Sequence, residues 1–425
     1  MSESANLPGL KSPRKWYQSI GPGLITACVV IGPGSILTSS KVGARNGFDL
    51  TWIVVLSVIF MMAFMQMGAR LGAVLKESPG TVIARRAGRW LAVVIGISIF
   101  FIASAFQFGN NLGVDSAFKS YVDFDYIVIV FNGLAIAFLF VFKDLYKAIE
   151  KLMMCFVGLM LVSFALNLGF ALSSMPDVQP VVPRDPDAPF LDISLLGLVG
   201  TTFVIAAAYY QAYLVQQKGW TRNEIHDGLI DARVGSVLMA VITLMIMCTA
   251  AAVLRGKTLG NVDDVAEQLA PLFGDLGKPL FCIGLFSAAY SSFLVNSMIG
   301  GFILSDGLGL GTKPSGLAPR LLTAAVLLTG MGVALYVILT DTRPVPAIVA
   351  AQAVTVLAAP LIGGVMLWLT NSKEVMGEDT NSLLVNVVGG IGLVLLLAMA
   401  WYTARYKVWP FVAIWWYTIF GIPGL

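Results

Sequence analysis

The stretch that decides the fold reads Gly21-Pro-Gly-Leu-Ile-Thr-Ala-Cys-Val-Val-Ile-Gly-Pro-Gly-Ser-Ile-Leu-Thr-Ser-Ser40. About 20 mostly apolar residues span the hydrocarbon core of a bilayer, so this segment can cross a membrane. Its middle holds Gly32-Pro33-Gly34, where proline removes a backbone donor and the glycines let the chain leave helical geometry. Carbonyl groups freed there are costly in hydrocarbon, so the break must face protein or a wet cavity.

This interruption has two interpretations. One is a plain proline kink, which is common in membrane helices. The other is a broken helix whose half-helix ends and free carbonyls bind a substrate, as in many transporters. Hydroxyl side chains directly after the break favour the substrate site: Ser35, Thr38, Ser39 and Ser40.

The composition identifies a polytopic membrane protein. Of 425 residues, 57% are apolar and only 12% are charged, whereas a soluble domain is about one-quarter charged. Mean hydropathy is +0.83, and the formal net charge is +3 without a polybasic block. These values exclude a soluble enzyme, a disordered chain and a nucleic-acid binder.

Several kinds of chemistry are also excluded. The four cysteines are separate and form no CxxC pair, and the single histidine, His226, lies in a polar loop. No Walker A, HExxH or GxSxG motif occurs, so we expect neither ATP drive nor an enzyme, and no cofactor. The first span lacks a clear cleavage site, so we expect no removable signal peptide.

Eleven segments are long and apolar enough to be spans. Lys and Arg concentrate in alternate loops, 17 of 27 on one side, which predicts a cytoplasmic N-terminus. The aromatic stretch 408–420 is too short to span and suits the membrane interface. The predicted spans are 20–42, 51–75, 90–113, 126–142, 146–172, 192–216, 233–254, 279–305, 319–340, 344–370 and 383–404.

The sixth span gives only a weak sign of a second break. Residues 200–216 contain no proline, and three alanines are followed by Tyr209, Tyr210 and Gln211. By itself this could be an ordinary helix with a polar face.

Several motifs together resemble the NRAMP family of divalent metal-ion transporters, from Gly21 to about residue 400. The resemblance implies two inverted five-helix repeats of the LeuT type within one transmembrane domain, 1–425. It places a cytoplasmic N-terminus at 1–19, the repeats at 20–172 and 192–370, an eleventh helix at 383–404 and an interfacial tail at 405–425. The motifs are Gly21-Pro-Gly-Leu24, residues 32–35, Gln66–Gly72, Ser291-Ser292, Gly300–Gly307, Arg320–Thr323, Gln352, Pro360 and Lys373–Glu378.

The departures from the family pattern lie at its metal site. Gly32 and Ser35 replace the Asp and Asn of the family's Asp-Pro-Gly-Asn motif. Val204, Ile205 and Ala206 fall where the family has Met-Pro-His, and Gln211 where it has a second histidine. The acids of the family's third helix are absent, with Gln107, Asn110 and Asn111 nearby, whereas Gln352 matches a family metal ligand.

These losses determine which substrates remain plausible. A manganese or iron ion stripped of water needs carboxylate, amide or thioether ligands, and a neutral pocket cannot repay its desolvation. The replacements are small, so we expect a wider, hydroxyl-lined chamber that takes an ion with its waters, as magnesium prefers. The expected substrate contacts are Gly32, Gly34, Ser35, Thr201, Val204, Ala206, Tyr209, Gln211 and Gln352, with Ser35 and Gln352 touching a metal through water.

The function expected is therefore facilitated uptake of a hydrated divalent cation, magnesium with some manganese, by a multi-pass protein of the inner (plasma) membrane. This resembles a magnesium-transporting branch of the family. Because spans one, three and six lack Asp, Glu and His in their cores, we expect transport without proton coupling. The alternative is a small neutral or zwitterionic organic solute. We expect a monomer in the lipid bilayer, without nucleic acid.

Overall fold

The computed structural model describes residues 21–119, 121–122, 124–142, 144–175, 193–259, 264–265, 277–340 and 355–408. Regular secondary structure in these ranges is helical throughout. The helices form because long apolar runs satisfy every backbone polar group internally, as a span in lipid requires.

The helices follow the predicted spans, with two short turns added. The helices are α1 Pro22–Val30, α2 Pro33–Asn46, α3 Thr51–Val74, α4 Pro79–Ala87, α5 Arg89–Lys119, α6 Ile127–Val141, α7 Leu145–Ser173, α8 Ile193–Thr202, α9 Ile205–Lys218, α10 Ile225–Val253, α12 Gly277–Gly307, α13 Leu317–Leu339, α15 Ala359–Asn371, α16 Lys373–Met376 and α17 Leu383–Thr403. The 3₁₀ turn η2 covers Arg222–Glu224 and the π-helical turn η4 covers Ala404–Val408.

Within the described ranges, eight segments are long and apolar enough to cross a membrane, the α8–α9 pair counting as one of them. The bent pair α1 and α2 makes a ninth. The apolar helices α6 and α15 are shorter, with 15 and 13 residues. All eleven predicted spans thus coincide with helices. The start of the tenth span and the aromatic tail at 409–420 lie outside the described residues.

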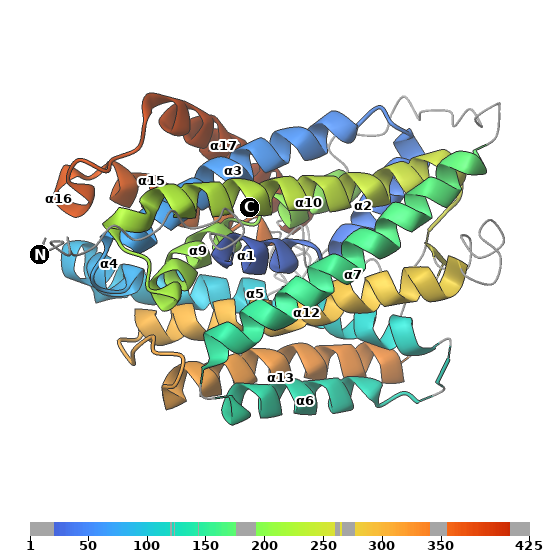
Figure 1. Cartoon of the computed structure of the whole chain (residues 1–425), viewed down its shortest axis with the longest axis horizontal. Helices are drawn as coiled ribbons and strands as arrows, with labels where there is room; N and C mark the ends of the chain where they lie inside the picture. Colours follow the sequence, from blue (N-terminus) through green and yellow to red (C-terminus); the bar gives the residue numbers. More distant parts are fainter. Residues whose placement is uncertain are drawn as a thin grey trace, which may run out of the picture.

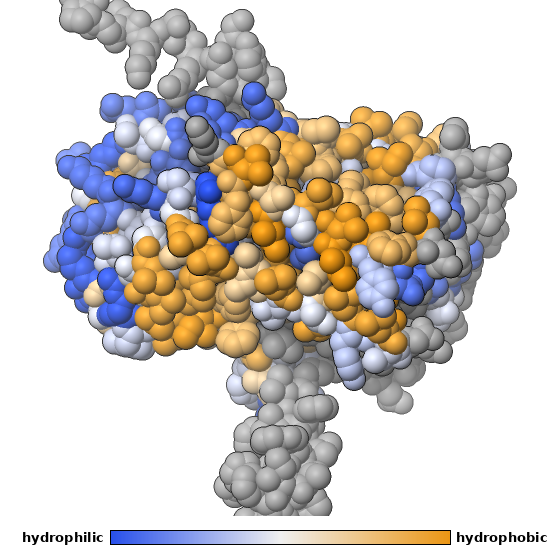
Figure 2. Space-filling view, turned by 90° about the horizontal axis from the view of Figure 1, so that it is seen from below, coloured by the Kyte–Doolittle hydropathy of each residue, from blue (hydrophilic) through white to orange (hydrophobic). Residues whose placement is uncertain are grey.

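The bundle has two polar ends separated by an apolar belt. Figure 2 shows this belt as an orange band. Large apolar side chains that the spanning helices expose include Phe101, Val141 and Trp401. We call one end the α4 end, where α1, α5 and α10 begin (left in Figure 1). We call the other the Gly256 end. There the backbone N–H of Gly256, just after α10, donates to the carbonyl of Ala44, near the end of α2, at 2.9 Å.

The broken helix lies at the centre of the bundle. Figure 1 shows α1 surrounded by α7, α9, α10 and α12, and every residue of α1 is buried. Lipid-facing helices such as α13 and α17 bury only about a quarter of their spanning segments, 28% each. The polar breaks are therefore kept away from lipid, which is the arrangement that makes non-helical backbone tolerable at membrane depth.

Candidate functional site

The first break lies where Gly32-Pro33-Gly34 predicts it. Helix α1 ends at Val30, α2 begins at Pro33, and the two are bent by 58°. Ile31 has ψ of 86°, and Gly32 is extended with φ of −121° and ψ of 179°. The chain therefore leaves helical geometry over two residues, which is a true interruption rather than a kink.

The carbonyl groups freed by this break are bound by hydroxyl side chains. Ser35 donates from Oγ to the carbonyl of Val30 at 2.5 Å. Ser292 of α12 donates from Oγ to the carbonyl of Val29 at 3.2 Å. Both serines keep lone pairs, so each can still accept a hydrogen bond from a water or a substrate.

The space beside Gly32 is already filled by polar side chains. A Cβ atom added at Gly32 would lie 3.1 Å from Oδ1 of Asn110 and 3.2 Å from Oγ of Ser292. Asn110 also donates from Nδ2 to Oγ of Ser292 at 3.1 Å. The glycine that stands in place of the family's aspartate therefore does not leave an empty space, because α5 and α12 supply neutral groups there.

A second break lies in the sixth span, where the sequence pattern indicates it only weakly. Helix α8 ends at Thr202 and α9 begins at Ile205, with Val204 at φ −87° and ψ 86°. The ring of Phe203 lies between the half-helices and packs on Phe60 and Phe64, with centroids 5.9 and 5.6 Å apart. Packing against α3 therefore stabilises a break that contains neither proline nor glycine.

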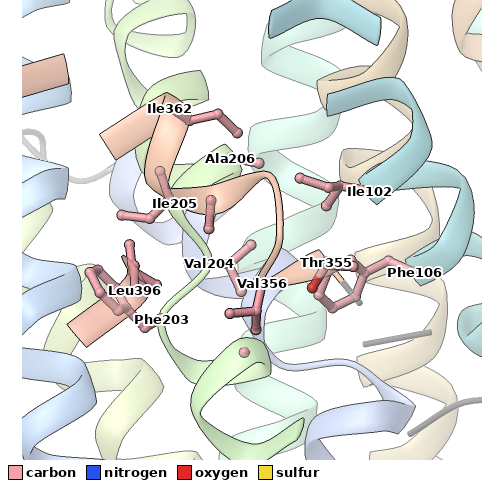
Figure 3. Close-up of a pocket in the computed structure, with 12 residues that line it drawn as sticks. Ile102, Phe106, Phe203, Val204, Ile205, Ala206, Thr355, Val356, Ile362 and Leu396 are labelled. Atoms are coloured by element: carbon pink, nitrogen blue, oxygen red, sulfur yellow. The ribbon is translucent and has the colours of Figure 1, made fainter. Parts of the chain in front are cut away.

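A small cavity of about 20 Å³ lies beside this second break (Figure 3). Val204 and Ala206, two of the predicted contacts, line it together with residues of α5, α15 and α17, and among the described lining residues Thr355 alone has a polar side chain. A space of this size holds about one water molecule. It is smaller than the chamber that small replacements predict. At the first break, Asn110 and Ser292 occupy the space next to Gly32.

The remaining predicted contacts lie in different parts of the bundle. Oγ1 of Thr201 lies 3.5 Å from Oγ1 of Thr38, next to the first break. Tyr209 is buried and packs on Tyr213, and Gln211 bonds Thr26 and Asp231, so both face the α4 end. Gln352 lies outside the described residues.

Buried carboxylates change the expected distribution of acids, and besides Asp306 of α12 the described helices bury two more. Helix α5 extends past residue 113, the predicted end of the third span, and brings the buried Asp115 into it. Asp231 in α10 is completely buried. The sequence pattern does not indicate Asp231 because the predicted seventh span begins at residue 233, which places this carboxylate in the preceding polar loop. In the structure α10 begins at Ile225, so Asp231 lies within a membrane helix, where a buried carboxylate is a sign of function.

A larger cavity, of about 350 Å³, lies at the Gly256 end. Three of its lining residues are cationic: Lys41 and Arg45 from α2, and Lys257 from the segment after α10. Asp264 is the acid that interacts with Lys41. Among the described groups around this cavity, cations thus outnumber acids.

Comparison with known proteins decides the family. The family model "Nramp: Natural resistance-associated macrophage protein-like" matches residues 23–404. The chain belongs to the Nramp family. Curated relatives of this Nramp chain include proteins named divalent metal cation transporter MntH. That of Verminephrobacter eiseniae is 27% identical, covering 89% of this chain and 87% of the relative, and that of Chromohalobacter salexigens is 26% identical, covering 91% of each.

Solved structures support the same fold. A mutant of the Eremococcus coleocola manganese transporter has a TM-score of 0.77 at 18% identity, covering 92% of this Nramp chain and 87% of that one. The same transporter in complex with an aromatic bis-isothiourea substituted compound gives 0.74 at 16% identity, covering 95% and 90%. The predicted all-helical, LeuT-type membrane fold and the family are confirmed, and the curated relatives are transporters rather than enzymes.

Proposed function

We propose that this Nramp protein is a secondary transporter that carries a divalent cation together with its waters, by alternating access about the two broken helices. The proposal includes magnesium as the main substrate, manganese as a weaker one, no proton coupling, and an inner-membrane location with the α4 end in the cytoplasm. The MntH names of its relatives support a divalent cation as substrate. The proposal that the ion keeps its waters is supported by one observation. The residues that meet at the first break are all neutral: Gly32, Ser35, Asn110 and Ser292.

Hydrated cargo also suits the polar atoms near the breaks. Within the described ranges, no three His, Cys, Asp or Glu side chains form a group that could hold a bare metal ion. Among the described residues, buried polar atoms without a protein partner are present instead: Oγ of Ser39 and Oγ1 of Thr202 on helices that flank the breaks, and Nε2 of Gln107 on α5. Such groups can bond the water shell of an ion without neutralising its charge.

The test is cation uptake into proteoliposomes, with a magnesium-sensitive dye and a pH dye inside. We expect saturable magnesium uptake without substrate-driven proton entry. Thr202→Val removes one unpartnered hydroxyl and should lower uptake about threefold, the effect of one hydrogen bond. Thr403→Val is the matched control, because its hydroxyl is also buried and unpartnered but lies at the end of α17. No magnesium flux, or proton entry that follows the substrate, contradicts the proposal.

The second candidate is a small organic solute that carries a carboxylate. The cation-lined cavity at the Gly256 end favours it, because Lys41, Arg45 and Lys257 attract an anionic group and repel a dication. Thermal stabilisation by an amino acid or a carboxylic acid, but not by millimolar magnesium, would support this candidate over the first.

A further inference from the structure

Asp231 connects the first half-helix to the rest of the bundle at the α4 end. Its Oδ1 accepts from the backbone N–H of Gly21 at 2.7 Å, and its Oδ2 accepts from that of Gly23 at 2.5 Å. Both donors belong to the start of α1, whose first N–H groups have no partner inside the helix. One buried carboxylate therefore caps the N-terminal end of α1 from a helix about 210 residues away in the sequence.

Gln211 brings the second half-helix into the same contact. Its Nε2 donates to Oδ2 of Asp231 at 3.1 Å, and its Oε1 accepts from Oγ1 of Thr26 at 2.5 Å. Thr26 lies in α1, Gln211 in α9 and Asp231 in α10. We call Asp231, Gln211 and Thr26, with the amides of Gly21 and Gly23, the inner latch. It joins the inner halves of both broken helices to α10.

The packing around the inner latch leaves little room for partial movement. A Cβ atom at Gly23 would overlap the carbonyl of Asp231, and one at Gly235 would overlap the carbonyl of Gly23, so α1 lies directly on α10. Next to Gly21, Lys218 of α9 and Glu150 of α7 form an ion pair at 2.9 Å, with Tyr146 donating to Glu150. These three groups are charged or titratable side chains beside the latch in the described part of the chain.

We propose that Asp231 is the positioning residue that holds α1 closed at the α4 end, and that opening of the path there begins when Gly21 and Gly23 separate from its carboxylate. This inference rests on the proposed alternating access. A carboxylate offers two acceptor oxygens, so it satisfies both amides at once. Asparagine offers one acceptor and places an NH₂ group against the other N–H, so it favours separation.

Cys28 is a native reporter of this opening, because it lies in α1 behind the inner latch and is fully buried. With Cys155, Cys248 and Cys282 replaced by alanine, Cys28 is the one remaining thiol. We expect a water-soluble maleimide to label Cys28 about tenfold faster in Asp231→Asn than in the parent, because a charge-assisted bond is lost. Asp231→Glu keeps two acceptor oxygens and should label more slowly than Asp231→Asn.

Two controls separate a latch from general loosening. A protein that keeps Cys282 alone reports on α12, and its labelling should not change with Asp231→Asn. Asp115→Asn removes a buried carboxylate near the far end of α5 and should leave Cys28 protected. Equal acceleration at both thiols, or unchanged labelling of Cys28 in folded Asp231→Asn, overturns the proposal. Labelling needs no substrate, so its outcome is independent of whether magnesium is transported.

Discussion

Restoring one carboxylate at the first break tests the central physical claim about this site. Gly32→Asp alone should be poorly tolerated, because its Cβ would lie 3.1 Å from Oδ1 of Asn110 and 3.2 Å from Oγ of Ser292. The new carboxylate would also be buried without a cation, which costs several kcal/mol. Asn110→Ala removes the nearer oxygen, so the double variant Gly32→Asp with Asn110→Ala gives the carboxylate room.

The size of the expected gain follows from electrostatics. A dication about 4 Å from a carboxylate gains roughly 8 kcal/mol at an effective dielectric constant of 20, before desolvation. If desolvation leaves only about a fifth of this gain, the Kd for manganese falls about tenfold. A ligand at 100 times its Kd stabilises the folded state by about 2.7 kcal/mol, which a thermal-shift measurement detects.

The assay compares four proteins, with and without manganese: the parent, each single variant and the double variant. We expect manganese to raise the unfolding temperature of the double variant and to leave the parent and Asn110→Ala unchanged. A shift in the parent as large as that in the double variant would refute the reasoning, because the native site would then already bind a bare transition metal.

Three further variants test how the fold supports the site. Asp306→Asn should lower the unfolding temperature and expose α4 to protease, because its Oδ2 accepts from the backbone N–H of Gly80 at 2.8 Å. Phe203→Ala should cost about 3–5 kcal/mol in the free energy of unfolding, since the ring packs on two phenylalanines of α3. Asp144 caps α7, and hydrogen bonds from Lys147 lower the pKa of Asp144 below its usual 3.8. Its contribution is therefore complete above that value and lost as the pH falls through the lower folded pKa, so the stabilities of Asp144→Asn and the parent should converge in acid.

The sequence predicts the first break because the signal is local. Gly32, Pro33 and Gly34 break a helix by their own backbone chemistry, whatever surrounds them. The second break at Phe203 and Val204 has no such residues, and its cause is the fit of a ring against α3. Propensity within one segment carries no information about that contact.

The inner latch lay beyond prediction for a related reason. Asp231 and Gly21 are 210 residues apart, and neither segment contains a pattern that indicates contact with the other. Asn110 was identified as a polar candidate of the third span, but its bond to Ser292 depends on how α5 packs on α12. The spans and their order could thus be predicted, whereas the partners of each polar group required the folded chain.

Hydrogen bonds from Ser292 and Ser35 to the carbonyls of Val29 and Val30 affect how tightly the first break can bind a cargo. Each carbonyl oxygen has two lone pairs and one of them is already used, so a cargo that bonds these oxygens gains less than it would from free carbonyls. A carrier built in this way binds loosely and releases quickly, and it suits a solute that is abundant on the side from which it enters.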